Sequence, residues 1–284
     1  MIIWSTDLHL NFLKTYNSAK YFAEYVSKEY QDAKSWIITG DISEANTLHG
    51  HLQELAEGFK KPIYFVLGNH DFYGSSWERV EKQLHSLVID TPNLFWLDQG
   101  PILSNRFSIT GTTSWYDATF GNSNSSVELN DFELISELKQ ASFSRYSLLE
   151  VIKNKSKTYA RALNDQLKKA CKESDLIIVA THVAPYAQAS WFEGKMSNSS
   201  WLPWFTSGAT GEVLDIYAKQ FEEKTFIVLC GHNHSSGIYS RFNNLTVYTG
   251  GASYYKPDVC GQIDLYKRIV TANDLNNKKV IQSY

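Results

Sequence analysis

Aspartate, asparagine and histidine side chains gather at five points of the sequence, each directly after a short apolar run. Five of the eight histidines of the chain stand at these points. Imidazole and carboxylate groups are the ligands that first-row metals such as Mn, Fe, Zn, Co and Ni bind in proteins. Eight such groups are too many for one metal ion and about right for two. They are Asp7, His9, Asp41, Asn69, His70, His182, His232 and His234.

The spacing within these clusters suits coordination. In the motif Asp7-Leu8-His9 the two polar residues alternate, and alternate residues of an extended chain point to the same side. The motif His232-Asn233-His234 repeats that alternation with two imidazoles. Taken singly, Asp7 or Asp41 would be interpreted as a helix N-cap and His182 as a hydrogen-bonded core histidine. Taken together, the clusters favour a metal site.

The elements that must position these clusters are buried strands. Near-continuous apolar runs are typical of strands covered on both faces of an α/β sheet. Helical spacing in residues 13–30, 45–58 and 75–88 separates the first runs and predicts βαβ crossovers. In such sheets ligands bind beyond the carboxyl ends of the strands, where the clusters stand. The runs are residues 2–4, 36–38, 63–67, 176–180 and 226–230.

The rest of the chain is less regular. Residues 93–111 and those after 235 contain short strand-like runs, and residues 146–173 form the longest helical pattern. Residues 112–145 and 186–210 are rich in polar and aromatic residues, which is typical of loops. We find no internal repeat and no linker. We therefore expect a single domain over residues 1–284, with a cap inserted by residues 112–145 and 186–210.

The order of the motifs resembles that of the calcineurin-like metallophosphoesterase superfamily. The motifs are Asp-x-His, Gly-Asp, Gly-Asn-His-Asp, a later Thr-His and a final Gly-His-Asn-His, and they span residues 7–234. Each motif alone is a weak signal, whereas five in this order are specific. The resemblance implies an α/β fold with a β-sandwich core flanked by helices, in αββα layers. It also implies two metal ions at the strand ends, Mn, Fe or Zn above all, with Ni and Co as further options.

The resemblance further implies a role for each motif residue. Asp41 would bridge the two metal ions. His70 would be the catalytic histidine, and Asp71 its orienting partner. The remaining motif residues would be ligands: Asp7, His9 and His234 for the first metal, and Asn69, His182 and His232 for the second.

The activity implied is hydrolysis of a phosphoester by a dinuclear metal site. Two metals about 3.5–4 Å apart clamp a phosphate and lower the pKa of a bridging water toward about 7, so hydroxide is the expected nucleophile. His70 as an imidazolium would stabilise developing charge or protonate the leaving oxygen.

Departures from the superfamily pattern bear on the substrate. Protein Ser/Thr phosphatases of the superfamily carry arginines beside the Gly-Asp and Gly-Asn-His motifs. Here the neighbours are Ile42-Ser43-Glu44 and Phe72-Tyr73-Gly74. We therefore expect a phosphodiesterase, with a phosphomonoesterase or protein phosphatase as the alternative. A non-catalytic metal-binding scaffold should have lost several ligands, and this chain keeps all seven and His70.

Composition narrows the partners. The chain has 27 Lys and Arg against 30 Asp and Glu, a net charge of −3, which does not indicate a nucleic-acid surface. Nucleic acid stays open as a substrate, but a small phosphoester or a nucleotide-type substrate is expected. The three cysteines form no CxxC motif, and we expect free thiols. No apolar run reaches 18 residues and the N-terminus lacks a signal-peptide pattern, so we expect a cytoplasmic protein without membrane contact. The oligomeric state stays open.

Aromatic residues are frequent, with 8 Trp, 17 Tyr and 15 Phe. Those of the two cap segments have two interpretations: a platform on which a base or aryl group of the substrate stacks, or a small hydrophobic core that holds the cap together. Trp115 and Tyr116 are the foremost stacking candidates because a short turn joins them to a strand-like segment, and Tyr73 should lie nearby. The other cap aromatics are Phe120, Trp191, Phe192, Trp201, Trp204 and Phe205.

Overall fold

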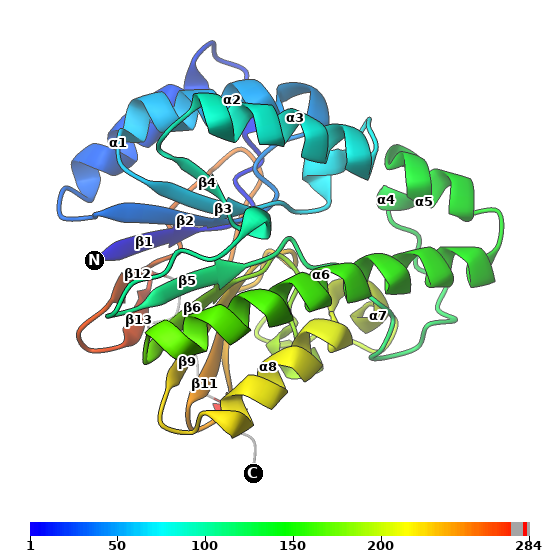
Figure 1. The fold of residues 1–284 in the computed structure, drawn as a ribbon. Coiled ribbons are helices and arrows are strands. Elements are labelled where there is room, and N and C mark those ends of the chain that lie inside the picture. The colour runs from blue at the N-terminus through cyan, green and yellow to red at the C-terminus, as the bar shows by residue number, and fades with distance from the viewer. Residues whose placement is uncertain (274–280, 283–284) are drawn as a thin grey trace.

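Two six-stranded sheets pack face to face, and helices cover both outer faces (Figure 1). The computed structural model describes residues 1–273 and 281–282. The strand order is β13-β12-β1-β2-β3-β4 in the first sheet and β14-β10-β11-β9-β6-β5 in the second. This arrangement of two sheets between helices confirms the predicted fold class.

The first sheet has four parallel strands and an antiparallel pair at one edge. Strands β1 to β4 pair in parallel, with Ile2 opposite Ser35 and Trp36 opposite Ile63. Strand β12 pairs antiparallel with β1 and with β13. The bounds are β1 Ile2–Ser5, β2 Ser35–Thr39, β3 Ile63–Val66, β4 Leu94–Trp96, β12 Gly261–Asp264 and β13 Ile269–Ala272.

The second sheet is built around β6 and β9, which pair in parallel from Leu176 opposite Thr225. Strands β5 and β11 extend it in parallel on either side, and β10 pairs antiparallel with β11. The bounds are β5 Ser108–Gly111, β6 Leu176–Ala180, β9 Thr225–Cys230, β10 Gly237–Phe242, β11 Leu245–Thr249 and β14 Ile281–Gln282. All five apolar runs that we predicted to be strands thus form strands.

The core between the sheets consists of side chains that point inward from both. Ile2, Trp4 and Ile37 of the first sheet pack in one buried cluster with Ile178 and Leu229 of the second. Because each of these strands also faces a helix layer on its other side, its sequence is apolar at nearly every position.

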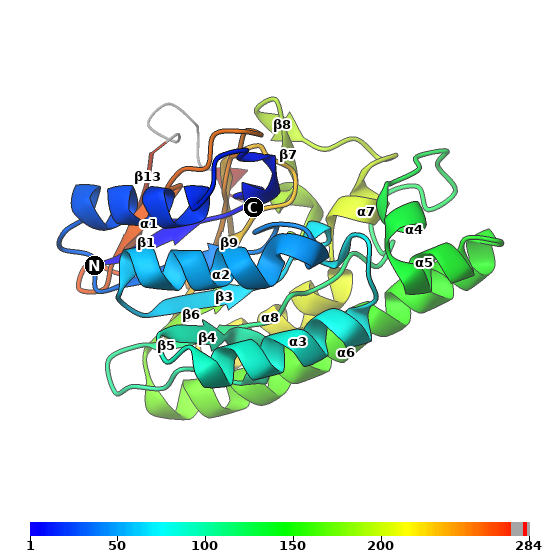
Figure 2. The ribbon, with the colours of Figure 1, turned by 90° about the horizontal axis from the view of Figure 1, so that it is seen from above.

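Helices α1, α2 and α3 cover the first sheet, and α6 and α8 cover the second (Figures 1 and 2). The side chains of Ser76, Ser144 and Ser207 cap α3, α6 and α8, each accepting a hydrogen bond from a backbone N–H in the first turn. The bounds are α1 Ser18–Glu29, α2 Ala45–Phe59, α3 Trp77–Asp90, α6 Arg145–Glu173 and α8 Gly208–Gln220. No helix in the described residues is both long enough and apolar enough to span a bilayer.

The two segments expected to form a cap lie against each other. The backbone N–H of Asn122 donates to the carbonyl of Ser199 (2.7 Å), and that of Ala118 donates to the carbonyl of Pro203 (3.0 Å). The elements that lie wholly within the segments are short: α4 Asp131–Leu134 and α5 Ser136–Ala141 in the first, and η4 Ala187–Ala189, β7 Trp191–Phe192, β8 Lys195–Met196 and α7 Leu202–Phe205 in the second. Short 3₁₀ helices follow β1, β3 and β4: η1 Leu10–Phe12, η2 His70–Phe72 and η3 Leu97–Gln99.

Candidate metal centre and active site

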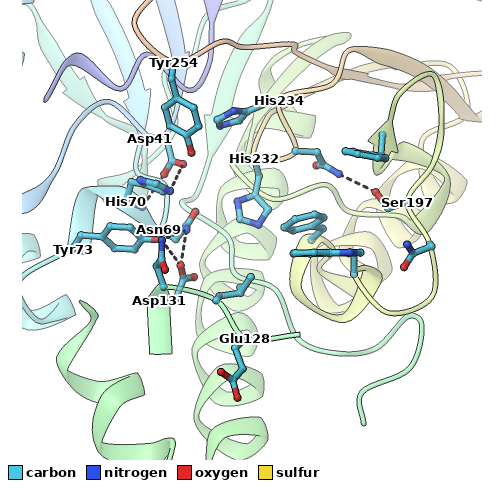
Figure 3. Close-up of a pocket in the computed structure, with 17 residues that line it drawn as sticks. Asp41, Asn69, His70, Tyr73, Glu128, Asp131, Ser197, His232, His234 and Tyr254 are labelled. Carbon is cyan, nitrogen blue, oxygen red and sulfur yellow. Dashed lines mark hydrogen bonds and ion pairs between the residues drawn. The ribbon is translucent and has the colours of Figure 1, made fainter. Parts of the chain in front are cut away.

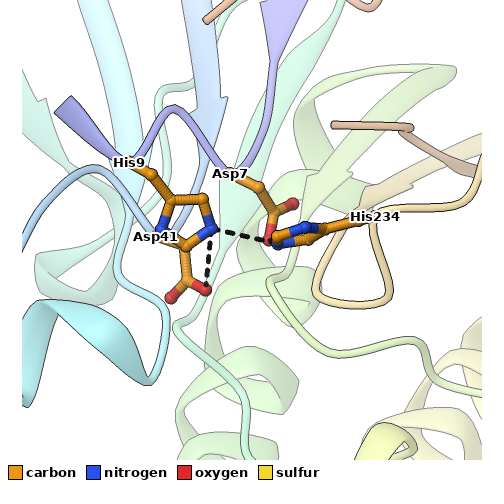
Figure 4. Close-up of side chains that lie close together, drawn as sticks. All are labelled: Asp7, His9, Asp41 and His234. Atoms are coloured by element: carbon orange, nitrogen blue, oxygen red, sulfur yellow. Dashed lines mark hydrogen bonds and ion pairs between the residues drawn. The ribbon is translucent and has the colours of Figure 1, made fainter. Parts of the chain in front are cut away.

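Four of the polar residues that follow the strands converge on one point (Figure 4). Nitrogen or oxygen atoms of Asp7, His9, Asp41 and His234 all lie within 4.8 Å of one another. The Nε2 atoms of His9 and His234 are 3.0 Å apart, and His234 Nε2 lies 3.4 Å from Asp7 Oδ1. These residues follow β1 and β2 of the first sheet and β9 of the second, so the packing of the two sheets face to face brings together ends that are far apart in sequence.

A second group shares Asp41 with the first. Ligand atoms of Asp41, His182 and His232 also lie within 4.8 Å of one another. His182 Nε2 is 3.3 Å from Asp41 Oδ1 and 3.2 Å from His232 Nδ1. The side-chain oxygen of Asn69 lies 3.1 Å from the same His182 nitrogen. The structure therefore brings all seven predicted ligands into two adjacent groups, with Asp41 common to both.

The histidines of the second group are held in a tautomer that suits a cation. His182 Nδ1 lies 2.8 Å from the carbonyl oxygen of Thr39, and His232 Nε2 lies 3.0 Å from that of Trp204. A carbonyl accepts only from a protonated nitrogen, so the neutral rings present His182 Nε2 and His232 Nδ1 as lone-pair donors. At 3.2 Å these two nitrogens need a proton or a metal ion between them. The donor set fits a metal ion.

The electrostatics of the site also favour positive charge. Burial opposes ionisation of Asp41, but His182 and His70 hold its pKa well below the usual range. Burial lowers the pKa of His182, but the Asp41 carboxylate raises it to about 10. Burial lowers the pKa of His9 and of His232 to about 4. Near neutral pH Asp41 is thus ionised and His9 and His232 are neutral, the forms that bind metals, whereas the proton of His182 must leave when a metal ion binds.

The backbone of five candidate ligands adopts a left-handed conformation that residues other than glycine rarely take. The φ angles are 50° at Asp7, 44° at His9, 49° at Asp41, 75° at His232 and 57° at His234. Each such residue costs about 1–3 kcal/mol and persists only where its surroundings hold it. Left-handed residues concentrate at functional sites, and here they turn the chain sharply after each strand.

Two glycines allow the loops to approach the carboxylates. A Cβ atom at Gly68 would overlap Asp41 Oδ1, and one at Gly231 would overlap Asp7 Oδ2 and Thr6 Oγ1. Any larger residue would displace these carboxylates from their positions.

His70 faces the site but belongs to neither ligand group. Its backbone N–H donates to Asp41 Oδ1 (2.9 Å), while its ring Nε2 lies 3.9 Å from Asp41 Oδ2. The ring stacks on Tyr73, with centroids 4.2 Å apart, and lines a cavity (Figure 3). This position suits a group that acts on a substrate rather than on a metal.

Asp71 does not take the position predicted for an orienting partner of His70. Its Oδ1 accepts from the backbone N–H of Ser43 and its Oδ2 from that of Gly68, both at 2.8 Å. Burial, with the charge of Asp41, raises the pKa of Asp71 to about 8. Asp71 thus ties the loop after β2 to the loop after β3, and the predicted contact with His70 is corrected.

A cavity of about 510 Å³ opens over the two groups (Figure 3). The loops after the strands form its floor, and both cap segments contribute walls. Trp201 and Phe205 stack on each other, with centroids 5.3 Å apart, and the Phe205 ring meets His232 edge-on at 4.9 Å. The lining residues are Asp41, Asn69, His70, Tyr73, Glu128, Leu129, Asn130, Asp131, Phe192, Ser197, Asn198, Trp201, Phe205, His232, Asn233, His234 and Tyr254.

Trp115 and Tyr116 lie beneath the cavity rather than in it. Trp115 is 1% exposed and packs against Phe72 and Trp77, and Tyr116 is fully buried against Trp204. As placed, they have no free ring face for a substrate, which corrects the expectation that they stack on one. Tyr73 does line the cavity. Among the other cap aromatics, Trp191 and Trp204 are buried, and Phe192, Trp201 and Phe205 line the cavity.

Sequence reasoning missed Asp131, a buried carboxylate on the cavity wall. It accepts hydrogen bonds from the side chains of Asn69, Tyr73 and Tyr116. No motif surrounds it, and its position follows from the folding of the cap segment. A lone aspartate in a polar stretch gives no signal of this kind.

The sequence of the chain matches the model of one protein family. A family model described as calcineurin-like phosphoesterase matches residues 2–260. A comparison with curated proteins gave no significant match.

Among solved structures, the chain resembles the phosphopantetheinyl hydrolase PptH from Mycobacterium tuberculosis, with a TM-score of 0.63 and 14% identity over 88% of this chain and 89% of that one. It also resembles the protein TT1561 of Thermus thermophilus, with a TM-score of 0.54 and 13% identity over 97% and 98%. A dimetal phosphatase from Danio rerio gives a TM-score of 0.53 and 12% identity over 88% and 86%. At these identities the likeness concerns the fold.

Proposed function

Because the chain belongs to the calcineurin-like phosphoesterase family, and is thus a metal-dependent phosphoester hydrolase, we propose that it hydrolyses phosphodiesters. The proposed residues are His70 as the acid and Asp41 as the bridge between two metal ions, with Mn, Fe or Zn as the proposed metals and Ni or Co as further options.

The observation that carries the diester proposal is the charge of the cavity. None of its 17 lining residues, all within the described part of the chain, is Lys or Arg, and Glu128, Asp41 and Asp131 are acidic. A phosphomonoester dianion carries a second charge, which a Lys or Arg in the site would stabilise by a charge-assisted hydrogen bond. A diester carries one charge and an organic group in place of the other, which suits this lining.

The cavity wall suggests what that organic group is. Trp201 is 38% exposed and stacked on Phe205, so a flat apolar surface begins directly beside His232. Stacking of a base on an aromatic side chain contributes about 1–3 kcal/mol. We propose that an aryl group or nucleobase of the diester packs on Trp201. This assigns the stacking role to a cap residue other than Trp115 and Tyr116.

The proposed roles divide between the floor and the wall. When bound, the two metal ions would polarise the phosphate and activate water. Asp7, His9 and His234 would hold one of them, and Asn69, His182 and His232 the other. His70 would donate a proton from its ring to the leaving oxygen. Tyr73, stacked on that ring, keeps its plane fixed.

The experiment is a hydrolysis panel on metal-free protein refilled with Mn, Fe, Zn, Ni or Mg. An aryl phosphodiester should react faster than the matching monoester. Faster hydrolysis of the monoester would overturn the diester proposal in favour of a phosphomonoesterase. Two bound metals without hydrolysis of either ester would favour a scaffold.

A pair of variants tests the wall. Trp201→Ala should lower kcat/KM for the aryl diester about 10–100-fold and spare a dialkyl diester. Phe143→Ala is the matched control, because Phe143 lies in the other cap segment, is 82% exposed and does not line the cavity. Equal losses on both substrates in Trp201→Ala would remove Trp201 from the substrate site.

A further inference from the structure

Asp131 is a buried carboxylate whose three side-chain donors are all neutral. It begins α4 in the first cap segment and is 1% exposed. Its Oδ1 accepts from Asn69 Nδ2 (2.9 Å) and from the Tyr73 hydroxyl (2.6 Å), and its Oδ2 accepts from the Tyr116 hydroxyl (2.8 Å). Burying a charge is costly unless hydrogen bonds replace the lost water. Three neutral donors converging on one buried carboxylate therefore point to a role.

The first consequence concerns the Asn69 amide, whose oxygen and nitrogen ends have nearly the same shape. Both Asp131 oxygens accept hydrogen bonds from these side chains, so Asp131 faces the NH₂ end of Asn69. The amide oxygen must then point the other way, where it lies 3.1 Å from His182 Nε2. With the amide reversed, two acceptors would face each other at Asp131.

The second consequence concerns His70. The Tyr73 hydroxyl donates to the same Asp131 oxygen, and its ring stacks on the His70 ring at 4.2 Å with an interplanar angle of 29°. A hydrogen bond at one end of Tyr73 thus fixes the plane on which His70 rests. The Asp131 carboxylate thus contacts the candidate ligand Asn69 directly, and it supports the candidate acid His70 through the ring of Tyr73.

We propose that Asp131 is a positioning residue of the metal centre, which orients the Asn69 amide oxygen toward the second metal and braces His70 through Tyr73. The inference rests on the proposed function, in which Asn69 is a ligand. It assigns a task to the cap segment: the segment walls the cavity and also completes the support of the metal site below it. Residues that orient metal ligands typically account for 10–100-fold in metal affinity.

The test is the affinity of metal-free protein for Mn²⁺, measured by calorimetric titration. Wild type should bind two ions. Asp131→Ala should bind the first as wild type does and the second about 10–100-fold more weakly. Asp131→Asn keeps one oxygen that can accept from Asn69, so it should recover most of the loss. Should the alanine variant not fold, Asp131→Ser carries the same expectation, since its side chain is too short to reach Asn69.

Asp117→Ala is the matched control. Asp117 is also buried, in the same segment, and its carboxylate accepts from the backbone N–H groups of Thr119 and Ala209 rather than from any site residue. This variant should lower the melting temperature and leave both affinities unchanged.

Two results would overturn the inference: wild-type affinities for both ions in Asp131→Ala, or an equal loss at the second site in Asp117→Ala. If wild type itself bound no second ion, the proposed function would fail instead.

Discussion

Replacing His70 by alanine separates catalysis from metal binding. The His70 ring belongs to neither ligand group, and its backbone N–H, which bonds Asp41 Oδ1 at 2.9 Å, is kept in the variant. Both metal sites should therefore stay intact. The stack on Tyr73 is lost, which costs about 0.5–1.5 kcal/mol, so the melting temperature should fall only slightly.

The expected loss of activity is much larger. General acid catalysis contributes about 10²–10⁴-fold, so kcat should fall by that factor, or about 3–5.5 kcal/mol in activation free energy. An acid matters most when the leaving oxygen is basic. The variant should therefore lose the full factor on an alkyl leaving group and much less on an activated aryl leaving group.

The assay measures kcat for two diesters that differ in the pKa of the leaving alcohol, together with metal content by elemental analysis. His85→Ala is the control, because His85 is an exposed histidine on α3 that contacts Gln99. The reasoning is refuted if His70→Ala loses a metal ion, which would make His70 a ligand. It is also refuted if both leaving groups slow equally.

Two further predictions concern buried carboxylates. Burial, opposed by hydrogen bonds from Thr113, raises the pKa of Asp98 from 3.8 to about 7, so the folded chain holds this proton more tightly than the unfolded chain. The free energy of unfolding should then fall between about pH 4 and pH 7, by up to about 1.4 kcal/mol per pH unit, and Asp98→Asn should remove that slope in urea titrations at pH 5 and pH 7. Asp71→Asn leaves a backbone N–H of Ser43 or Gly68 without its acceptor and should cost about 1–3 kcal/mol of stability. Unlike His70→Ala, it should leave the rate ratio of the two diesters unchanged, and a changed ratio would restore the orienting role.

The floor of the site was predictable because its determinants are local. Apolar runs such as residues 176–180 can only be buried strands in a chain of this composition, and parallel strands bring their carboxyl ends to one edge. Asp7 and Asp41 follow strands of the first sheet and His182 follows a strand of the second, so they meet where the two sheets pack face to face, whatever the loops elsewhere do. The order of these motifs along the chain indicated the family.

The walls of the cavity were not predictable, because the residues that place each wall side chain lie far apart in sequence. Trp115 is buried because Phe72 and Trp77 reach it from other elements. Trp201 lines the cavity because the second cap segment folds over the first. We predicted Asp71 as a partner of His70, but it accepts from backbone N–H groups of two loops. The sequence does not indicate where backbone N–H groups will lie, so this contact could not be predicted.

Asp41 is the residue common to the two candidate metal groups, so a dinuclear site depends on it most directly. The direct measurement is the number of metal ions per chain, with activity, in wild type and Asp41→Asn after loading with Mn²⁺. We predict two ions in wild type, fewer in the variant, and a loss of activity by orders of magnitude. Two ions and full activity in Asp41→Asn, or fewer than two ions in wild type, would contradict the dinuclear site.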